Sequence, residues 1–158
     1  MIRKTLTWLT AAALVSACAS TPTPAPITDT AARTPQLSTL ARLIGEAGLA
    51  DTLRGPGPYT VFAPSDDAFK AVPAATMQQL ASNKELLKSV LSFHVLPARV
   101  SAAEVKPGNV KTVQGAEVTL ARSGAFVTVE DAVVTQADVA ASNGVVHVID
   151  RVLMPPRR

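Results

Sequence analysis

Two aspartates stand side by side in the stretch "TVFAPSDDAF" (60–69), and paired carboxylates can do several kinds of chemistry. Asp66 and Asp67 could bind a metal ion, form an acid–base pair or make a recognition patch. They could also begin a helix, because Ser65 can cap its first free amides and the helix dipole favours negative charge there. Site-type acids normally come with a partner histidine, acid or cysteine in the same motif, whereas a helix start needs no such partner. We therefore interpret Ser65, Asp66 and Asp67 as a structural helix start.

The two histidines, His94 and His147, are the only ones in the chain. A pair of imidazoles could bind a metal or transfer a proton, but two histidines without a clear third ligand make a weak zinc site. The alternative is a buried imidazole that hydrogen-bonds to the backbone and fixes a strand. His147 alternates with two valines in "GVVHVID", so it can face the opposite side of its strand. We favour this structural interpretation and predict no metal site.

The remaining polar residues give no catalytic set. Ser65 lacks the G-x-S-x-G turn of a nucleophilic serine, and no base with an orienting acid accompanies it. Asp150 follows a predicted strand, and we expect it to bond the backbone at a turn rather than bind calcium. The run "GPGP" (55–58) has prolines where a phosphate-binding loop needs amides. The sequence therefore predicts a protein that is not an enzyme and needs no cofactor.

Residues 1–17 have the pattern of an export signal, with a basic start, an apolar middle and small residues after it. The stretch "LVSAC" (14–18) resembles the bacterial lipobox, in which the cysteine is diacylated and becomes the first residue. Cys18 is the only cysteine, and two acyl chains of the palmitate type would anchor the protein stably in a membrane. The alternative is an ordinary signal with a chance cysteine. Ala19 after the cysteine favours the outer membrane, while the face of that membrane stays open.

Net charge gives little support for nucleic-acid binding. The formal charge of the whole chain is +3, from 15 Lys+Arg and 12 Asp+Glu. Removing residues 1–17 takes away Arg3 and Lys4, so that 13 basic residues remain against 12 acidic ones and the charge falls to +1. No basic stripe and no alternation of basic and aromatic residues remain.

The segment that follows the cysteine differs in composition from the rest of the chain. Residues 18–35 are rich in proline and small polar residues, which predicts an extended tether that cannot bury enough surface to fold. We expect the folded domain over residues 36–155 and a short basic tail at 156–158.

Hydrophobic periodicity changes once within this domain. Helical spacing of leucines begins near Gln36, and further helices are expected after a short strand at 59–63. From His94 onward the segments are short, β-branched and alternating, and Gly, Pro or Asn separate them. Helices first and hairpins second predict an α+β domain with a largely antiparallel sheet.

Three segments resemble the signatures of the fasciclin domain family. They are "GPGPYTVFAPSDDAF" (55–69), "SFHVLPARV" (92–100) and "ASNGVVHVIDRVLMP" (141–155). The resemblance spans residues 36–155 and implies a compact wedge of mostly antiparallel strands that carries a helical layer. It also implies a domain used for adhesion and extracellular binding, with no shared catalytic mechanism.

The same resemblance marks four candidate partner-binding residues. The family's central Tyr-His motif is Phe93-His94 here, so a hydroxyl that could make contacts is missing. Asp138-Val139 occupies the place of an Asp-Ile pair that is implicated in receptor contact in animal members. We expect the contact region around Phe93, His94, Asp138 and Val139.

Together these patterns predict a lipid-anchored, extracytoplasmic binding module of the bacterial cell envelope. It would act in cell adhesion, or in attachment to a polysaccharide or protein of the envelope or matrix. A periplasm-facing scaffold or assembly protein without an external ligand is the alternative. A third possibility is an enzyme acting on envelope glycans or esters, but the sequence shows no pair of catalytic acids and no nucleophile with a base. The sequence leaves the partner and the oligomeric state open.

Overall fold

The computed structural model of this chain describes residues 24–156. Helices dominate the first part and strands the second, as the sequence predicts for an α+β domain. The elements are α1 (Ile27–Arg33), the 3-10 helix η1 (Pro35–Leu37), α2 (Ser38–Glu46), α3 (Ala50–Arg54), β1 (Tyr59–Pro64), α4 (Asp66–Lys70), α5 (Ala74–Ser82), α6 (Lys84–Phe93), β2 (Val95–Leu96), β3 (Gly108–Lys111), β4 (Glu117–Ser123), β5 (Phe126–Val129), β6 (Ala132–Ala141) and β7 (Gly144–Ile149).

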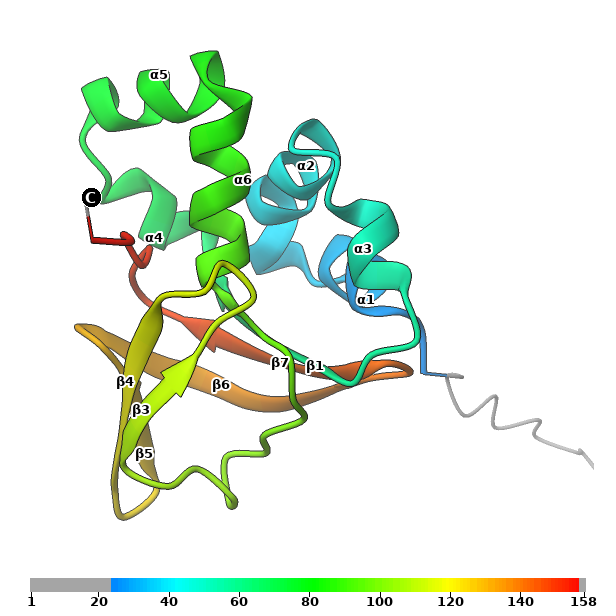
Figure 1. Ribbon diagram of the computed structural model, residues 1–158, viewed down its shortest axis with the longest axis vertical. Helices are drawn as coiled ribbons and strands as arrows, with labels where there is room; N and C mark the ends of the chain where they lie inside the picture. The colour runs from blue at the N-terminus through cyan, green and yellow to red at the C-terminus, as the bar shows by residue number, and fades with distance from the viewer. Residues whose placement is uncertain (1–23, 157–158) are drawn as a thin grey trace, which may run out of the picture.

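The strands form one curved, mixed sheet in the order β2-β1-β7-β6-β5-β4-β3. Neighbouring strands are antiparallel except for β1 and β7, which run parallel and pair from Tyr59↔Gly144 to Pro64↔Ile149. Beyond β3, the amide of Val113 donates to the carbonyl of Val95 in β2 at 2.8 Å. This bond brings the two edges of the sheet together, so the sheet closes nearly into a barrel (Figure 1). The predicted fasciclin-like arrangement of mostly antiparallel strands is confirmed.

The helices gather on one side of this sheet (Figure 1), and the central strands β1 and β7 are buried on both faces. Alternation along β1 and β7 explains this, because successive side chains of a strand point to opposite faces. Val61 and Val146 pack under the helices in one hydrophobic cluster, with Leu40, Leu43, Leu87 and Leu91 among others. Phe62 and Ile149 point into the curved sheet and join a second cluster with Leu96, Val118, Leu120 and Val129.

Two of the helices begin at side-chain caps, and the sequence predicts the first of these. The Ser65 hydroxyl accepts from the amide of Ala68 at 3.2 Å, at the start of α4. The Asn83 carbonyl oxygen accepts from the amide of Leu86 at 3.1 Å, at the start of α6. Each cap satisfies a backbone donor that the first turn leaves free, so both helix starts are fixed locally.

The prediction that residues 18–35 form an extended tether is wrong for the part that the structure describes. Residues 27–33 form α1, in which Ile27 and Ala31, one turn apart, are 0% and 1% exposed. The amide of Ile27 donates to the side chain of Asn143 at 3.0 Å, which ties this helix to the turn between β6 and β7. The folded unit therefore begins before Gln36, because the apolar residues Ile27 and Ala31 form one face of α1 and are buried against the rest of the domain.

The predicted signal (1–17) and lipidated Cys18 lie outside the described residues, as do Arg157 and Arg158. Within residues 24–156, none of the helices has the length and apolar character needed to cross a bilayer.

Candidate functional site

His94 lies at the C-terminal end of α6, and both of its ring nitrogens bond the backbone. Nδ1 donates to the carbonyl of Val90 at 2.7 Å, and Nε2 accepts from the amide of Leu153 at 2.9 Å. The ring is 1% exposed, and this burial lowers its pKa to about 4, although the bond to Val90 acts in the opposite direction. His94 is therefore neutral near pH 7 and joins α6 to the C-terminal segment.

The structure contradicts the prediction that Phe93 and His94 contact a partner. Phe93 is 2% exposed and packs in the hydrophobic cluster inside the curved sheet, and both polar atoms of His94 already have partners in the protein. The physical reason is the place of these residues at the end of α6, where the chain turns inward to begin β2. The structural interpretation of His94 is confirmed.

His147, in β7, has the same kind of role. Its Nε2 donates to the carbonyl of Val100 at 2.8 Å, and its Nδ1 accepts from the amide of Asp138 at 3.2 Å. The ring also stacks on Phe62, with centroids 5.7 Å apart. His147 faces away from Val146 and Val148 and fixes the backbone of β6 beside it, so its structural interpretation is confirmed as well.

Asp138 and Val139 lie in an irregular part of β6, where the register against β7 shifts. Asp138 adopts a φ of 56°, a left-handed conformation that few residue types other than glycine, asparagine and aspartate adopt readily. Its carboxylate is exposed and accepts from the amide of Ala102 at 2.8 Å, and its own amide bonds His147. Of the four predicted contact residues, these two alone reach the surface, with Val139 half-buried.

Asp66 and Asp67, the adjacent aspartates that were predicted to begin a helix, have separate structural roles. Asp66 accepts from the Ser38 hydroxyl at 2.7 Å and from the amide of Thr39 at 2.9 Å, so it caps α2 from a distance in sequence. Slight desolvation acts to raise the pKa of Asp66, but the bonds from Ser38 and Thr39 hold it below its usual value. Asp67 is exposed and pairs with Lys70 at 2.8 Å.

Asp150 also bonds the backbone, as expected for a turn. Its carboxylate accepts from the amide of Val133 at 2.8 Å, and its amide donates to the carbonyl of the same residue at 3.1 Å. Among residues 24–156, no three His, Cys, Asp or Glu side chains form a group that could hold a metal ion.

Sequence reasoning missed the importance of Asn143, which it treated only as part of an Asn-Gly turn. Its side-chain amide donates to the carbonyls of Leu53 and Gly55, and its oxygen accepts from Ile27. One side chain thus joins the β6–β7 turn to α1 and to the end of α3. The position of Asn143 at the head of the third signature was the available signal.

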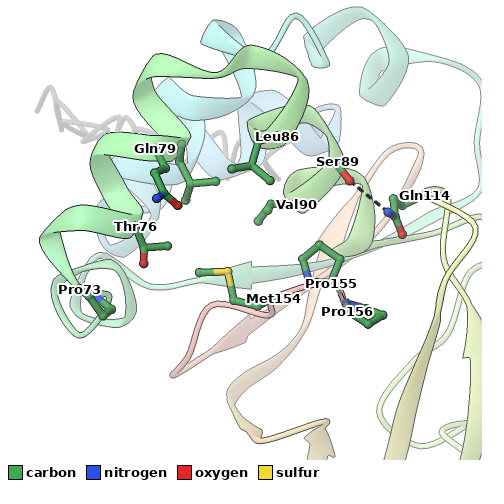
Figure 2. Close-up of a pocket in the computed structure, with 11 residues that line it drawn as sticks. Pro73, Thr76, Gln79, Leu86, Ser89, Val90, Gln114, Met154, Pro155 and Pro156 are labelled. Carbon is green, nitrogen blue, oxygen red and sulfur yellow. Dashed lines mark hydrogen bonds between the residues drawn. The ribbon is translucent and has the colours of Figure 1, made fainter. Parts of the chain in front are cut away.

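A hollow on the described surface lies between α5, α6 and the C-terminal residues 154–156. We call it the α5–α6 groove; its volume is about 680 Å³. Figure 2 shows Thr76 and Gln79 reaching in from α5, Leu86 and Val90 from α6, and Met154 from the C-terminal segment. His94 connects two parts of the lining, because its bonds join Val90 to Leu153, the residue before Met154. No sequence motif predicted this groove.

The fold is that of an α+β domain, a nearly closed mixed sheet under a layer of helices. Both histidines of the signature segments bond the backbone, and the irregular strand β6 is exposed. A family model, the fasciclin domain, matches residues 35–155. The chain belongs to the fasciclin domain family.

Relatives of known name support this assignment along most of the chain. Protein sll1483 of Synechocystis sp. is 43% identical over 132 residues, which cover 82% of this chain and 73% of that protein. The immunogenic protein MPB70 of Mycobacterium bovis is 42% identical, over 83% of this chain and 69% of its own length. The cell surface glycolipoprotein MPB83 of the same species is 39% identical, over 83% of this chain and 61% of its own length.

A solved structure agrees with the fold. The FAS1 domain pair from the insect cell adhesion molecule Fasciclin I superposes with a TM-score of 0.59 and 26% identity, over 75% of this chain and 45% of that one. This chain therefore spans less than half of the solved domain pair. The names of these relatives associate the family with cell surfaces and cell adhesion.

Proposed function

We propose that this chain is a binding module of the cell envelope that acts in adhesion or in attachment to a polysaccharide or protein of the envelope or matrix. The observation that carries the proposal is the irregular part of β6, which presents Asp138 on the surface beside half-buried Val139. The named cell-surface and cell-adhesion relatives support the same class of function. The proposal assigns no catalytic step to any residue.

Asp138 suits a contact site because its geometry is fixed before a partner arrives. Bonds through His147 and Ala102 hold both its backbone and its carboxylate. A contact group that is already ordered loses little conformational entropy on binding. The carboxylate still has lone pairs to accept further hydrogen bonds, which suits hydroxyl, amide or cationic groups on a polymer.

A conservative substitution tests this site. Asp138→Asn keeps an oxygen for the amide of Ala102 and tolerates the left-handed backbone, but it removes the charge. We expect this variant to fold normally and to lose at least tenfold in retention on isolated envelope or matrix material. Asp51→Asn, at a fully exposed acid of α3, is the matched control and should bind like the wild type. Equal retention of both variants would refute the assignment of Asp138.

The anchor is the second part of the proposal. Diacylation of Cys18 would hold the domain at the membrane. We expect radiolabelled palmitate to enter the wild-type protein and a Ser20→Ala control, and not a Cys18→Ala variant, which should leave the membrane fraction. Palmitate labelling of the Cys18→Ala variant would contradict the lipobox interpretation.

Adhesion to other cells or to matrix also requires the domain to face outward. Treating intact and gently permeabilised cells with proteinase K, at a concentration that digests the purified protein, distinguishes the two faces. Digestion on intact cells is the expected result. Protection until permeabilisation would instead favour a periplasm-facing scaffold, and the external adhesion role would have to be abandoned.

A further inference from the structure

The α5–α6 groove differs in the charge of its lining from two other hollows of the described surface. None of the eleven residues that line it is acidic or basic. One of these two hollows, of about 400 Å³, contains Glu117, Glu130, Asp131 and Arg151. The other, of about 640 Å³, contains Asp66, Asp67, Lys70 and Asp150. Among the residues that the structure describes, no side chain lining the α5–α6 groove offers an opposite charge to a charged ligand group, so this part of the lining is complementary to a neutral ligand.

Apolar side chains form most of the groove and remain partly open to water. Leu86 is 37% exposed and Met154 is 44% exposed, which makes them two of the few large hydrophobic residues at the described surface. Both point toward the hollow from opposite walls (Figure 2), and the buried residues Leu80 and Val90 line it as well. An apolar ligand would remove this surface from water, and the flexible methionine could adjust to its shape.

A few uncharged polar side chains line the groove on both sides. Thr76 and Gln79 are three residues apart on α5, so they share one face of the helix, and both point into the groove (Figure 2). On the other side, the Gln114 amide donates to the Ser89 hydroxyl at 3.0 Å. A hydroxyl and an amide can bond an ester, a carbonyl or a hydroxyl without requiring a charge.

The walls of the groove are also held in place. The bonds of His94 join Val90 on α6 to Leu153, the residue before Met154. The volume of about 680 Å³ lies within the range of about 300–1,000 Å³ that is usual for small-molecule sites, which are mostly apolar with a few placed polar groups.

We propose that the α5–α6 groove binds a neutral lipid-type molecule, a single acyl chain that ends in an uncharged polar group. The chain lies against Leu86 and Met154, and the polar end bonds Thr76 or Gln79. This inference is independent of the proposed function, since it needs neither the acid at 138 nor a lipid on Cys18.

A matched pair of ligands tests the inference. The protein is residues 24–158, which contain every described element and both hydrophobic clusters. The probes are 1-monodecanoylglycerol and decanoate, which have the same ten-carbon chain and differ in the charge of the polar end; both are used below the concentration at which they form micelles. Isothermal titration calorimetry should show saturable one-to-one binding of the glycerol ester, with decanoate at least tenfold weaker.

Three variants locate the site. Leu86→Glu and Met154→Glu place a charge in the groove at side chains that already touch water, and each should weaken binding of the ester at least tenfold. Val113→Glu, at an exposed valine (42%) that does not line the groove, is the control and should bind like the wild type. Circular dichroism establishes that all three fold.

Four results would overturn the proposal. They are the absence of saturable binding, equal binding of decanoate and the ester, equal loss in all three variants, and a dimer of the wild type in sedimentation analysis that Leu86→Glu dissociates. The last result would make the groove an interface between two copies of the chain. None of these results bears on the retention assay with Asp138→Asn, so the two proposals fail separately.

Discussion

At the scale of single residues, His94 shows how a buried imidazole limits stability in acid. Its Nε2 accepts a hydrogen bond from Leu153, so a proton at this nitrogen would break the bond and place a charge in the interior. The unfolded chain, by contrast, takes up that proton at the ordinary pKa of 6.5. Acid therefore favours the unfolded state.

The sign and range of the effect follow from these two pKa values. The folded pKa of about 4 lies below the unfolded value of 6.5, so the contribution of neutral His94 is complete above pH 6.5 and is lost as pH falls toward 4. The shift corresponds to about 3 kcal/mol in the free energy of unfolding. Urea unfolding at intervals between pH 7.5 and 4 would measure it. His94→Gln, which cannot gain a proton, should depend less on pH over this range, and an unchanged slope would contradict the prediction.

The two neighbouring aspartates provide a second comparison at this scale. Asp66 caps α2 through Ser38 and Thr39, whereas Asp67 only pairs with Lys70 on the surface. We expect Asp66→Ala to lower the free energy of unfolding by about 1 kcal/mol, the usual effect of losing a helix cap. Asp67→Ala should change it little, because exposed ion pairs contribute weakly. Chemical unfolding of both variants would check this, and an equal loss in the two would refute the separate role of Asp66.

At the scale of elements, the sequence predicted local structure well and long-range contacts poorly. Ser65 and the acids after it predicted the start of α4, since capping depends on neighbours in the chain. The bond from Ser38 to Asp66 spans 28 positions, and no local pattern encodes it. Helix α1 was missed because Ile27 becomes buried only through contact with Asn143 and the β6–β7 turn.

For the candidate site, too, the sequence predicted the features that depend on neighbouring residues and not those that depend on long-range pairing. The alternation around His147 correctly predicted its direction, since period two is a property of the strand itself. The burial of Phe93 could not be predicted, because the direction of the chain at the end of α6 depends on how β2 pairs with β1. The exposure of Asp138 depends on a register shift between β6 and β7, and such shifts leave little trace in the pattern of a single sequence.

The pairing of β1 with β7 depends on one glycine. Gly144 lies opposite Tyr59 in the register, and a Cβ at this position would overlap the carbonyl oxygen of Tyr59. We expect Gly144→Ala to lower the free energy of unfolding by about 3 kcal/mol, because the backbone of a central strand has to shift. Gly45→Ala is the control, since nothing lies within 4 Å of its Cβ position in α2, and it should stabilise the protein by about 0.5 kcal/mol. Thermal unfolding of both variants would show opposite shifts in Tm; a loss from Gly144→Ala no larger than 0.5 kcal/mol would contradict the close approach.

At the scale of the whole molecule, two hydrophobic clusters share the same two strands. Leu40 belongs to the cluster under the helices and Phe62 to the cluster inside the curved sheet. Strands β1 and β7 contribute side chains to both, because their residues alternate between the faces. Neither cluster can therefore lose its packing without disturbing the strands that support the other, and we expect the domain to unfold as one cooperative unit.

Substitutions in the two clusters test whether the domain unfolds as one cooperative unit. Leu40→Ala and Phe62→Ala remove side chains that are 1% and 0% exposed, so each should lower the free energy of unfolding by about 2–5 kcal/mol. Leu86→Ala, at a leucine that is 37% exposed, is the control and should cost much less. The helices report through circular dichroism at 222 nm, and the cluster inside the curved sheet reports through the NMR signals of Val118, Leu120 and Val129. Coincident curves from both signals are expected in every variant. If Phe62→Ala separated the transition of the cluster inside the curved sheet from the helical one, the two clusters would be independent folding units, and their shared strands would not couple them.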